Sequence, residues 1–231
     1  MLAATLVVGA AVQGLVGLGV GLVSAPVVTL LAPELMPGML LFMGFFTPAF
    51  TLLADRSDID WRGLGWSLPL RIPGTALGVV LVAVVDDRAL GLAVGVMVLL
   101  SVLVTWRAVH VPINRVNLSV AGLVSGVTGT ATSIGGPPLA VLYQHERPAR
   151  IRNTLAVYFA VGAVFSLVGL GIAGRITSAE IGLAVLYLPA LGLGLVLASA
   201  VRRRLPTDSI RTGVLVVCAL SAGALLVRSL V

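Results

Sequence analysis

The feature that most constrains this chain is the stretch GLVSGVTGTATSIGGPPLAVLY, residues 122–143. It lies within residues 116–145, which contain no Asp, Glu, Lys or Arg. Such a run is apolar enough to cross a membrane, yet it concentrates Gly, Pro, Thr and Ser, which are weak helix formers. Irregular backbone at membrane depth is tolerated only where protein buries it or where it lines a wet cavity. The stretch therefore predicts a helix break inside a membrane protein.

The composition agrees with a membrane protein. Hydrophobic residues make up 58% of the 231 residues and charged residues make up 10%, whereas soluble domains carry about 25% charged residues. No basic residue precedes the first apolar run, so we expect a retained membrane segment there and not a cleaved signal peptide. The predicted fold class is all-α, a polytopic bundle whose apolar segments are 1–33, 38–54, 63–85, 89–106, 116–144, 153–174, 179–201 and 212–227.

Two of these segments are too long for a single crossing. As uninterrupted helices, 1–33 and 116–144 would be about 50 Å and more than about 40 Å long at 1.5 Å per residue. The hydrocarbon core of a bilayer is about 30 Å thick. Both segments also have clustered Gly and Pro near their middles. They are therefore either long helices that protrude or re-entrant hairpins that break and turn back.

The arginines favour the hairpins. If every segment crosses once, the loop arginines divide 8 to 6 between the two sides. If 1–33 and 116–144 are re-entrant, they divide 11 to 3, and cytoplasmic loops are the ones enriched in Arg. The majority side then holds Arg56, Arg62, Arg107, Arg115, Arg147, Arg150, Arg152, Arg202, Arg203, Arg204 and Arg211, and the minority side holds Arg88, Arg175 and Arg228. We predict six full spans and two re-entrant hairpins, with both termini outside.

The two halves of the chain resemble each other. Gly14, Gly17, Pro26 and Glu34 recur at an offset of 112, and Pro73 and Gly78 recur at an offset of 116. Residues 1–110 and 111–231 thus form two repeats, each a broken hairpin followed by three transmembrane helices. An odd number of crossings in each half makes the repeats inverted, a recurring design of secondary transporters. The alternative is a duplicated structural bundle without a substrate path.

The Gly-rich breaks predict a site for an oxyanion. Helix N-termini bind anions through free amides and the helix dipole, and glycine lets the backbone approach a ligand closely. The predicted site residues are Gln13, Gly17, Gly19, Gly21 and Ser24 at the first break and Thr128, Thr130, Thr132, Ser133, Gly135, Gly136 and Pro137 at the second. The alternative for the glycines is close helix packing through small residues.

Arg71 is the most informative single residue. It lies about nine residues into the segment 63–85 as counted from Arg62, near the centre of the bilayer, where a charge is costly and indicates function. A guanidinium suits a bidentate oxyanion. The alternative is an arginine bonded to backbone carbonyls of a broken helix. The repeat partner of Arg71 is Tyr187, a neutral donor, and Asn153 is a further candidate, although we expect it to cap a helix.

Several other classes of function are disfavoured. No Gly-x-Ser-x-Gly, HExxH, P-loop or paired-Cys motif is present, so we expect no enzyme, no cofactor and no metal. The net charge of +6 comes from short-loop arginines that set topology, so nucleic acid is not an expected partner. The expected partners are a small anionic substrate and the lipid bilayer. The sequence leaves open an anion channel and a homo-oligomer.

The residues also resemble a known family. GLVGLGVGLVSAPVV and GLVSGVTGTATSIGGPPLAVL resemble the paired Gly-rich motifs of the TauE/SafE membrane permeases, also called the sulfite exporter family. The later stretches IPGTALGVVLVAVVDDRAL and LPALGLGLVLASAVRRRLPTDSIRTGVLVV are similar to the helices that follow those motifs. The second motif is the closer match, since the first reads GLVSAP where the family often has consecutive glycines.

This resemblance implies a transporter of small sulfur-containing anions, such as sulfite or organosulfonates, in the bacterial inner membrane. It does not name the substrate or the direction of transport, and a non-sulfur organic anion stays open as an alternative. From the residues themselves we expect a site near the middle of the membrane, formed by the backbone amides of the two helix breaks, by Thr and Ser hydroxyls and by Arg71.

Overall fold

The computed structural model describes residues 1–17, 20–106, 111–202, 216 and 218–227, and the regular structure in these ranges is helical. The helices are α1 (Leu2–Val16), α2 (Val20–Leu31), η1 (Pro33–Leu35), α3 (Gly38–Ala54), α4 (Trp61–Val84), α5 (Asp87–Trp106), α6 (Arg115–Thr132), α7 (Pro137–Tyr143), α8 (Pro148–Ile172), α9 (Ser178–Leu186) and α10 (Leu188–Arg202). A further apolar helix covers Cys218–Val227. The prediction of an all-α fold is confirmed.

Polar residues mark where several helices begin. The Asp60 carboxylate accepts from the Gly63 N–H at 3.1 Å at the start of α4, and the Asn114 side chain accepts from the Asn117 N–H at 2.8 Å at the start of α6. Thr177 and Glu180 form a reciprocal capping box on α9. These side chains satisfy N–H groups that the first helical turn leaves without partners.

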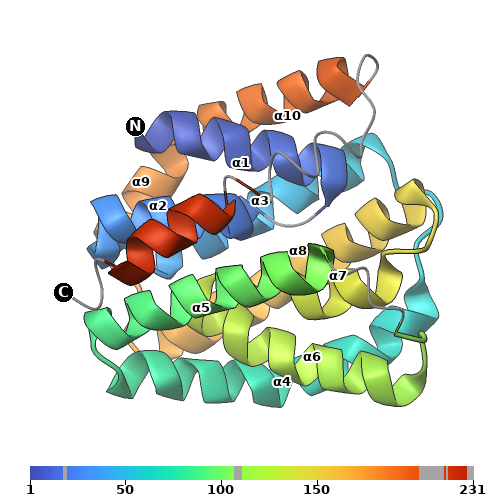
Figure 1. The fold of residues 1–231 in the computed structure, drawn as a ribbon, viewed down its shortest axis with the longest axis horizontal. Helices are drawn as coiled ribbons and strands as arrows, with labels where there is room; N and C mark the ends of the chain where they lie inside the picture. The colour runs from blue at the N-terminus through green and yellow to red at the C-terminus, as the bar shows by residue number, and fades with distance from the viewer. Residues whose placement is uncertain (18–19, 107–110, 203–215, 217, 228–231) are drawn as a thin grey trace.

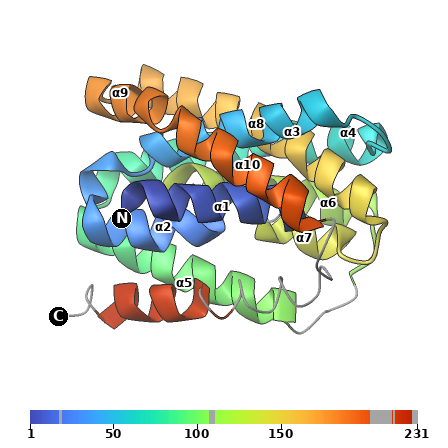
Figure 2. The ribbon, with the colours of Figure 1, turned by 90° about the horizontal axis from the view of Figure 1, so that it is seen from above.

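The long helices lie roughly side by side along one axis (Figure 1). α2 returns beside α1, and α7 returns beside α6, so each Gly-rich segment forms an antiparallel pair of helices. α1 packs against α10, and α4 packs against α6 along much of its length. Figure 2 shows the helix Cys218–Val227 beside α5, where Leu226 contacts the position of Gly95.

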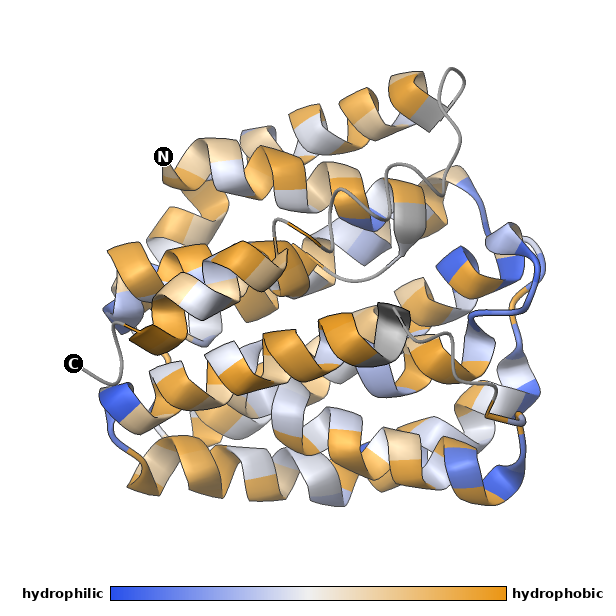
Figure 3. Cartoon of the chain, in the orientation of Figure 1, coloured by the Kyte–Doolittle hydropathy of each residue, from blue (hydrophilic) through white to orange (hydrophobic). Residues whose placement is uncertain are grey.

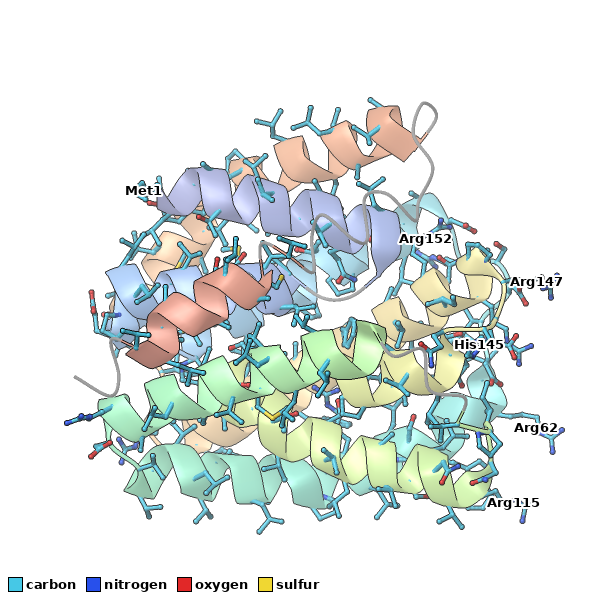
Figure 4. The ribbon with its side chains drawn as sticks, in the orientation of Figure 1. Met1, Arg62, Arg115, His145, Arg147 and Arg152 are labelled. Atoms are coloured by element: carbon cyan, nitrogen blue, oxygen red, sulfur yellow. The ribbon has the colours of Figure 1, made fainter. Side chains whose placement is uncertain are left out.

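Hydrophilic residues gather at the two ends of this axis, and most of them lie at one end (Figure 3). Arg62, Arg115, Arg147 and Arg152 all lie at that end, whereas Met1 lies at the other (Figure 4). We call it the arginine-rich end. These four arginines share one end, as predicted from the 11-to-3 division. The predictions for Arg107, Arg203, Arg204, Arg211 and Arg228 fall outside the described residues.

The exterior suits a lipid environment. α4 and α8 are each long and apolar enough to cross a membrane, and the bent pair α9–α10 passes the same test as one span with a 42° bend. α4 exposes Ile72, Leu77, Val80 and Val84 on its outer face. Polar side chains such as Thr47, Ser67 and Ser166 are instead buried. This distribution is the one expected when the solvent is lipid.

Helix α8 differs from the prediction. It begins at Pro148, not at residue 153, because Pro suits the first helical turn and ion pairs to neighbouring carboxylates hold the arginines of that turn. Asn153 is therefore an interior helix residue, and the expectation that it caps the helix is wrong. Its side-chain amide donates to the Ser57 carbonyl at 2.7 Å instead.

Candidate functional site

Both Gly-rich segments are broken as predicted. α1 ends at Val16 and is capped by Gly17, whose φ of 76° favours glycine and whose N–H donates to the Gln13 carbonyl at 2.9 Å. α6 ends at Thr132 and is followed by Ser133, which adopts a left-handed φ of 60° that is uncommon for a residue with a side chain. Residues 134–136 are not helical, and α7 then begins with Pro137 in its first turn. Gly19 lies outside the described residues.

The two breaks meet inside the molecule. A Cβ added at Gly21, near the start of α2, would lie 2.1 Å from the Ser133 carbonyl oxygen, so only glycine fits at this contact. A cavity with about 450 Å³ of empty space, its open mouth included, lies at this junction. Its lining comes from both breaks and from α3 and α8: Gln13, Val20, Gly21, Leu22, Leu40, Leu41, Gly44, Pro48, Gly129, Ser133, Ile134, Gly135, Gly136, Phe159 and Ala163. We call it the central cavity.

Gln13 is a polar side chain in the wall of the central cavity. It lines the central cavity and is only 1% exposed. Neither its Oε1 nor its Nε2 has a hydrogen-bond partner among the described residues. A buried polar group left unsatisfied costs about 1–3 kcal/mol, and a ligand that bonds the Gln13 amide would offset this cost.

Arg71 lies directly behind the cavity wall. Its side chain is buried, its guanidinium stands 4.5 Å from the centre of the Tyr158 ring, and its Nη1 donates to Ser125 Oγ at 3.4 Å. The Ser125 hydroxyl in turn donates to the Gly135 carbonyl in the second break. None of the ion pairs among the described residues includes Arg71, and its Nε has no hydrogen-bond partner there.

Glycines bring this cation close to the cavity. A Cβ added at Gly129, which lines the cavity, would lie 3.1 Å from Arg71 Nη2 and 3.1 Å from Gly135 Cα. A Cβ at Gly162 of α8 would overlap the guanidinium itself, at 2.0 Å from its central carbon. Arg71 thus sits in a slot made by two glycines and the Tyr158 ring, one residue away from the cavity. Because Arg71 has no carboxylate partner among the described residues, its charge gives the cavity a positive field.

The three predicted threonines do not line the central cavity. Thr130 is bonded to Ser166 at 2.7 Å, and Thr132 donates to the Thr128 carbonyl at 2.8 Å. Neither Thr130 nor Thr132 lines the central cavity, and neither does Thr128, whose buried hydroxyl has no partner among the described residues. Ser133 does line it, with its hydroxyl donating to the Pro37 carbonyl at 3.0 Å.

Several other predicted site residues lie away from the central cavity. Tyr187 stands at the bend between α9 and α10, and Ser24 is a buried residue whose hydroxyl is 3.5 Å from the Thr5 carbonyl. Asn153 faces the loop after α3.

Gly17 and Pro137 lie at the two breaks but are not among the residues that line the central cavity. The predicted residues that the structure brings to the cavity are Gln13, Gly21, Ser133, Gly135 and Gly136.

Two of the repeated glycines serve close packing between helices. Gly14 packs against Ala198 of α10, and Gly126 packs against the backbone of Arg71 and Gly74 in α4. Gly129 combines this packing with a place in the cavity wall.

The sequence-based prediction did not identify Ser125, Tyr158 and Gly162, which hold Arg71. Tyr158 and Gly162 are four residues apart on α8, so they share a helix face, but nothing in their spacing marks that face as polar. It also overlooked Glu180, a 2% exposed carboxylate in α9 that accepts from the Gly38 N–H at 3.0 Å and so caps α3.

Ion pairs and hydrogen bonds link several elements at the arginine-rich end. Asp60 accepts from the Tyr143 hydroxyl at 2.8 Å and pairs with Arg150 at 3.3 Å. Burial raises the pKa of Asp60, but the Gly63 N–H, Tyr143 and Arg150 together outweigh burial and lower it below its usual value. Hydrogen bonds from Ser57 likewise hold the pKa of Asp55 well below its usual range.

Comparison with known proteins identifies one family. The sequence profile of one family, described as sulfite exporter TauE/SafE, matches residues 1–225. The chain belongs to the TauE/SafE family. No curated protein and no solved structure gives a significant match. Membership of the TauE/SafE family agrees with a membrane transporter and not with an enzyme.

Proposed function

We propose that this protein is a secondary transporter of small sulfur-containing anions, such as sulfite or organosulfonates, and that it binds them in the central cavity. The observation that carries the proposal is Arg71, a buried cation without a carboxylate partner among the described residues, next to the junction of two helix breaks. A charge buried in a membrane protein is costly and commonly marks a substrate or ion site.

Each part of the cavity has a role in this proposal. Arg71 supplies the charge that attracts the anion through the Gly129–Gly135 wall. The Gln13 amide donates to an oxygen of the anion, and the backbone of Gly135 and Gly136 approaches it without an intervening Cβ. The free amides at the start of α2 add a positive helix end beside Val20 and Gly21.

The architecture that suits this function is a pair of inverted repeats, residues 1–110 and 111–231. The α1–α2 hairpin begins at the end opposite the arginine-rich end, and the α6–α7 hairpin begins at the arginine-rich end (Figure 1). With six further spans, the repeats would face opposite ways and place the site between them. The positive-inside rule then assigns the arginine-rich end to the cytoplasm of a bacterial inner membrane, with the termini outside.

The test uses the full-length protein in detergent and in proteoliposomes. Sulfite should raise the thermal midpoint of the wild type, because a ligand that binds only the folded state stabilises it by about 2.7 kcal/mol at one hundred times Kd. Arg71→Leu should abolish this shift and the flux of sulfite. Arg62→Leu, which removes an exposed arginine at the arginine-rich end, is the control and should keep both.

Two results would contradict the proposal. A sulfite-dependent shift in Arg71→Leu equal to that of the wild type would remove Arg71 from the site. Folded wild-type protein that neither binds nor moves sulfite or any small organosulfonate would contradict the function itself.

A further inference from the structure

A second cavity lies outside the central one, at the arginine-rich end of the molecule. It has about 540 Å³ of empty space, its open mouth included. Its lining pairs the charged side chains of Asp55 and Arg152 with apolar walls from Phe50 and Leu195. We call it the outer cavity.

The two cavities lie on either side of the end of α1. Gln13 lines the central cavity, and its neighbour Gly14 lines the outer one. A Cβ at Gly17, where α1 breaks, would lie 3.4 Å from Arg152 Cα. Arg152 therefore lies beside the end of α1, next to the residues that line the two cavities.

Asp55 and Arg152 form an ion pair that can exchange partners. The side chain of Arg152 is 13% exposed and that of Asp55 is 34% exposed, so both face the cavity mouth without being free in solvent. Asp55 also accepts from the Ser57 N–H at 2.9 Å and from the Ser57 hydroxyl at 2.7 Å. Asp55 can therefore release Arg152 and still keep hydrogen-bond partners, which lowers the cost of breaking the pair.

We propose that the outer cavity is a second anion site, in which the oxyanion of a small soluble organic anion replaces Asp55 on Arg152. A guanidinium binds a carboxylate and a sulfonate with similar bidentate geometry, so the two compete for the same nitrogens. The walls formed by Phe50 and Leu195 accept a short apolar body. The assignment of the anion class rests on the function proposed above.

The experiment is calorimetric titration of the full-length protein with isethionate in phosphatidylcholine nanodiscs. The wild type should show a weaker binding event in addition to that of the central cavity. Arg152→Gln should remove the weaker event and keep the central one. Asp55→Asn, which removes the competing carboxylate, should strengthen the weaker event by about tenfold, the order of effect that charge pairs show in such exchanges.

Arg147→Gln is the matched control, because Arg147 is ion-paired to Asp58 at 3.2 Å but is 75% exposed. It should leave both events unchanged. The proposal is overturned if Arg152→Gln keeps the weaker event, if Arg147→Gln loses it equally, or if Asp55→Asn weakens it. It is also overturned if phosphatidylglycerol in the nanodisc removes the event, since the occupant would then be a lipid headgroup. Absence of the central event alone would contradict the function proposed above and not this second site.

Discussion

At the scale of single residues, the central cavity is defined by side chains that the protein itself leaves incompletely satisfied. Within the described part of the chain, the Gln13 amide has no hydrogen-bond partner and Arg71 has no carboxylate partner. Such groups lower the stability of the ligand-free protein, and a bound anion that interacts with them offsets this cost. The cost in the empty state and the affinity for an anion therefore have the same origin.

Gln13→Leu separates these two effects because leucine has a similar volume and no polar atoms. We expect the substrate-free protein to gain about 1–3 kcal/mol of stability, the usual cost of an unsatisfied buried group. We expect sulfite binding to weaken by about tenfold or more, the value of one hydrogen bond to a charged group. Thermal unfolding with and without sulfite measures both. A variant that loses stability and keeps the wild-type affinity would contradict this role.

The contact between the two breaks predicts a strict size limit at Gly21. Gly21→Ala places a methyl group 2.1 Å from the Ser133 carbonyl oxygen, and both sides of that contact are backbone. We expect a loss of about 1–3 kcal/mol, as in overpacked cores, together with weaker anion binding. Gly65→Ala in α4 is the control, because a Cβ there meets no atom within 4 Å. Equal stability of the two variants would show that the breaks do not press on each other.

At the scale of elements, the loop between α3 and α4 is fixed by the start of α8 and the end of α7. Asp60 joins three of these elements: it caps α4, accepts from Tyr143 of α7 and pairs with Arg150 of α8. The network holds the outer end of the second hairpin against the following helices. Its carboxylates are the groups through which pH acts on this end.

The pKa of Asp60 is lowered in the folded protein, so its contribution to stability is present above the unfolded value near 3.8 and is lost as the pH falls through the folded value. We expect Asp60→Asn to lower the thermal midpoint at pH 7. We also expect a shallower fall of that midpoint between pH 5 and about pH 3 than in the wild type. Thermal scans over this range measure both slopes, and identical slopes would contradict the role of Asp60.

The same scale shows what the sequence could predict. Both breaks follow from Gly and Pro in runs too long for one crossing, and most helix bounds follow from apolar length. The unexpected start of α8 depends on carboxylates from a distant loop that pair with Arg150 and Arg152. The slot around Arg71 depends on how α6 and α8 pack against α4, which local pattern does not specify. The hydrogen bonds of Thr130 to Ser166 and of Thr132 to the Thr128 carbonyl depend on how the helices turn and pack, which the sequence pattern does not specify.

At the scale of the whole molecule, the proposed topology gives each end a fixed side of the membrane. Ser57 is exposed near the arginine-rich end, and Ser178 is exposed at the start of α9, near the opposite end. In a Cys218→Ala background, we expect an impermeant thiol reagent added outside cells to label Ser178→Cys and not Ser57→Cys. Permeabilised cells should label both. The reverse pattern would place the arginine-rich end outside and contradict the proposed orientation.

The measurement that tests the central claim most directly is the position of a bound anion. Selenite is a pyramidal anion like sulfite, and its selenium can be located by anomalous scattering in crystals of the protein. We predict a selenium peak in the central cavity, between the Gln13 amide and the backbone of Gly135, and its loss in Arg71→Leu. A central cavity that stays empty while selenite occupies only the surface of the arginine-rich end would contradict it.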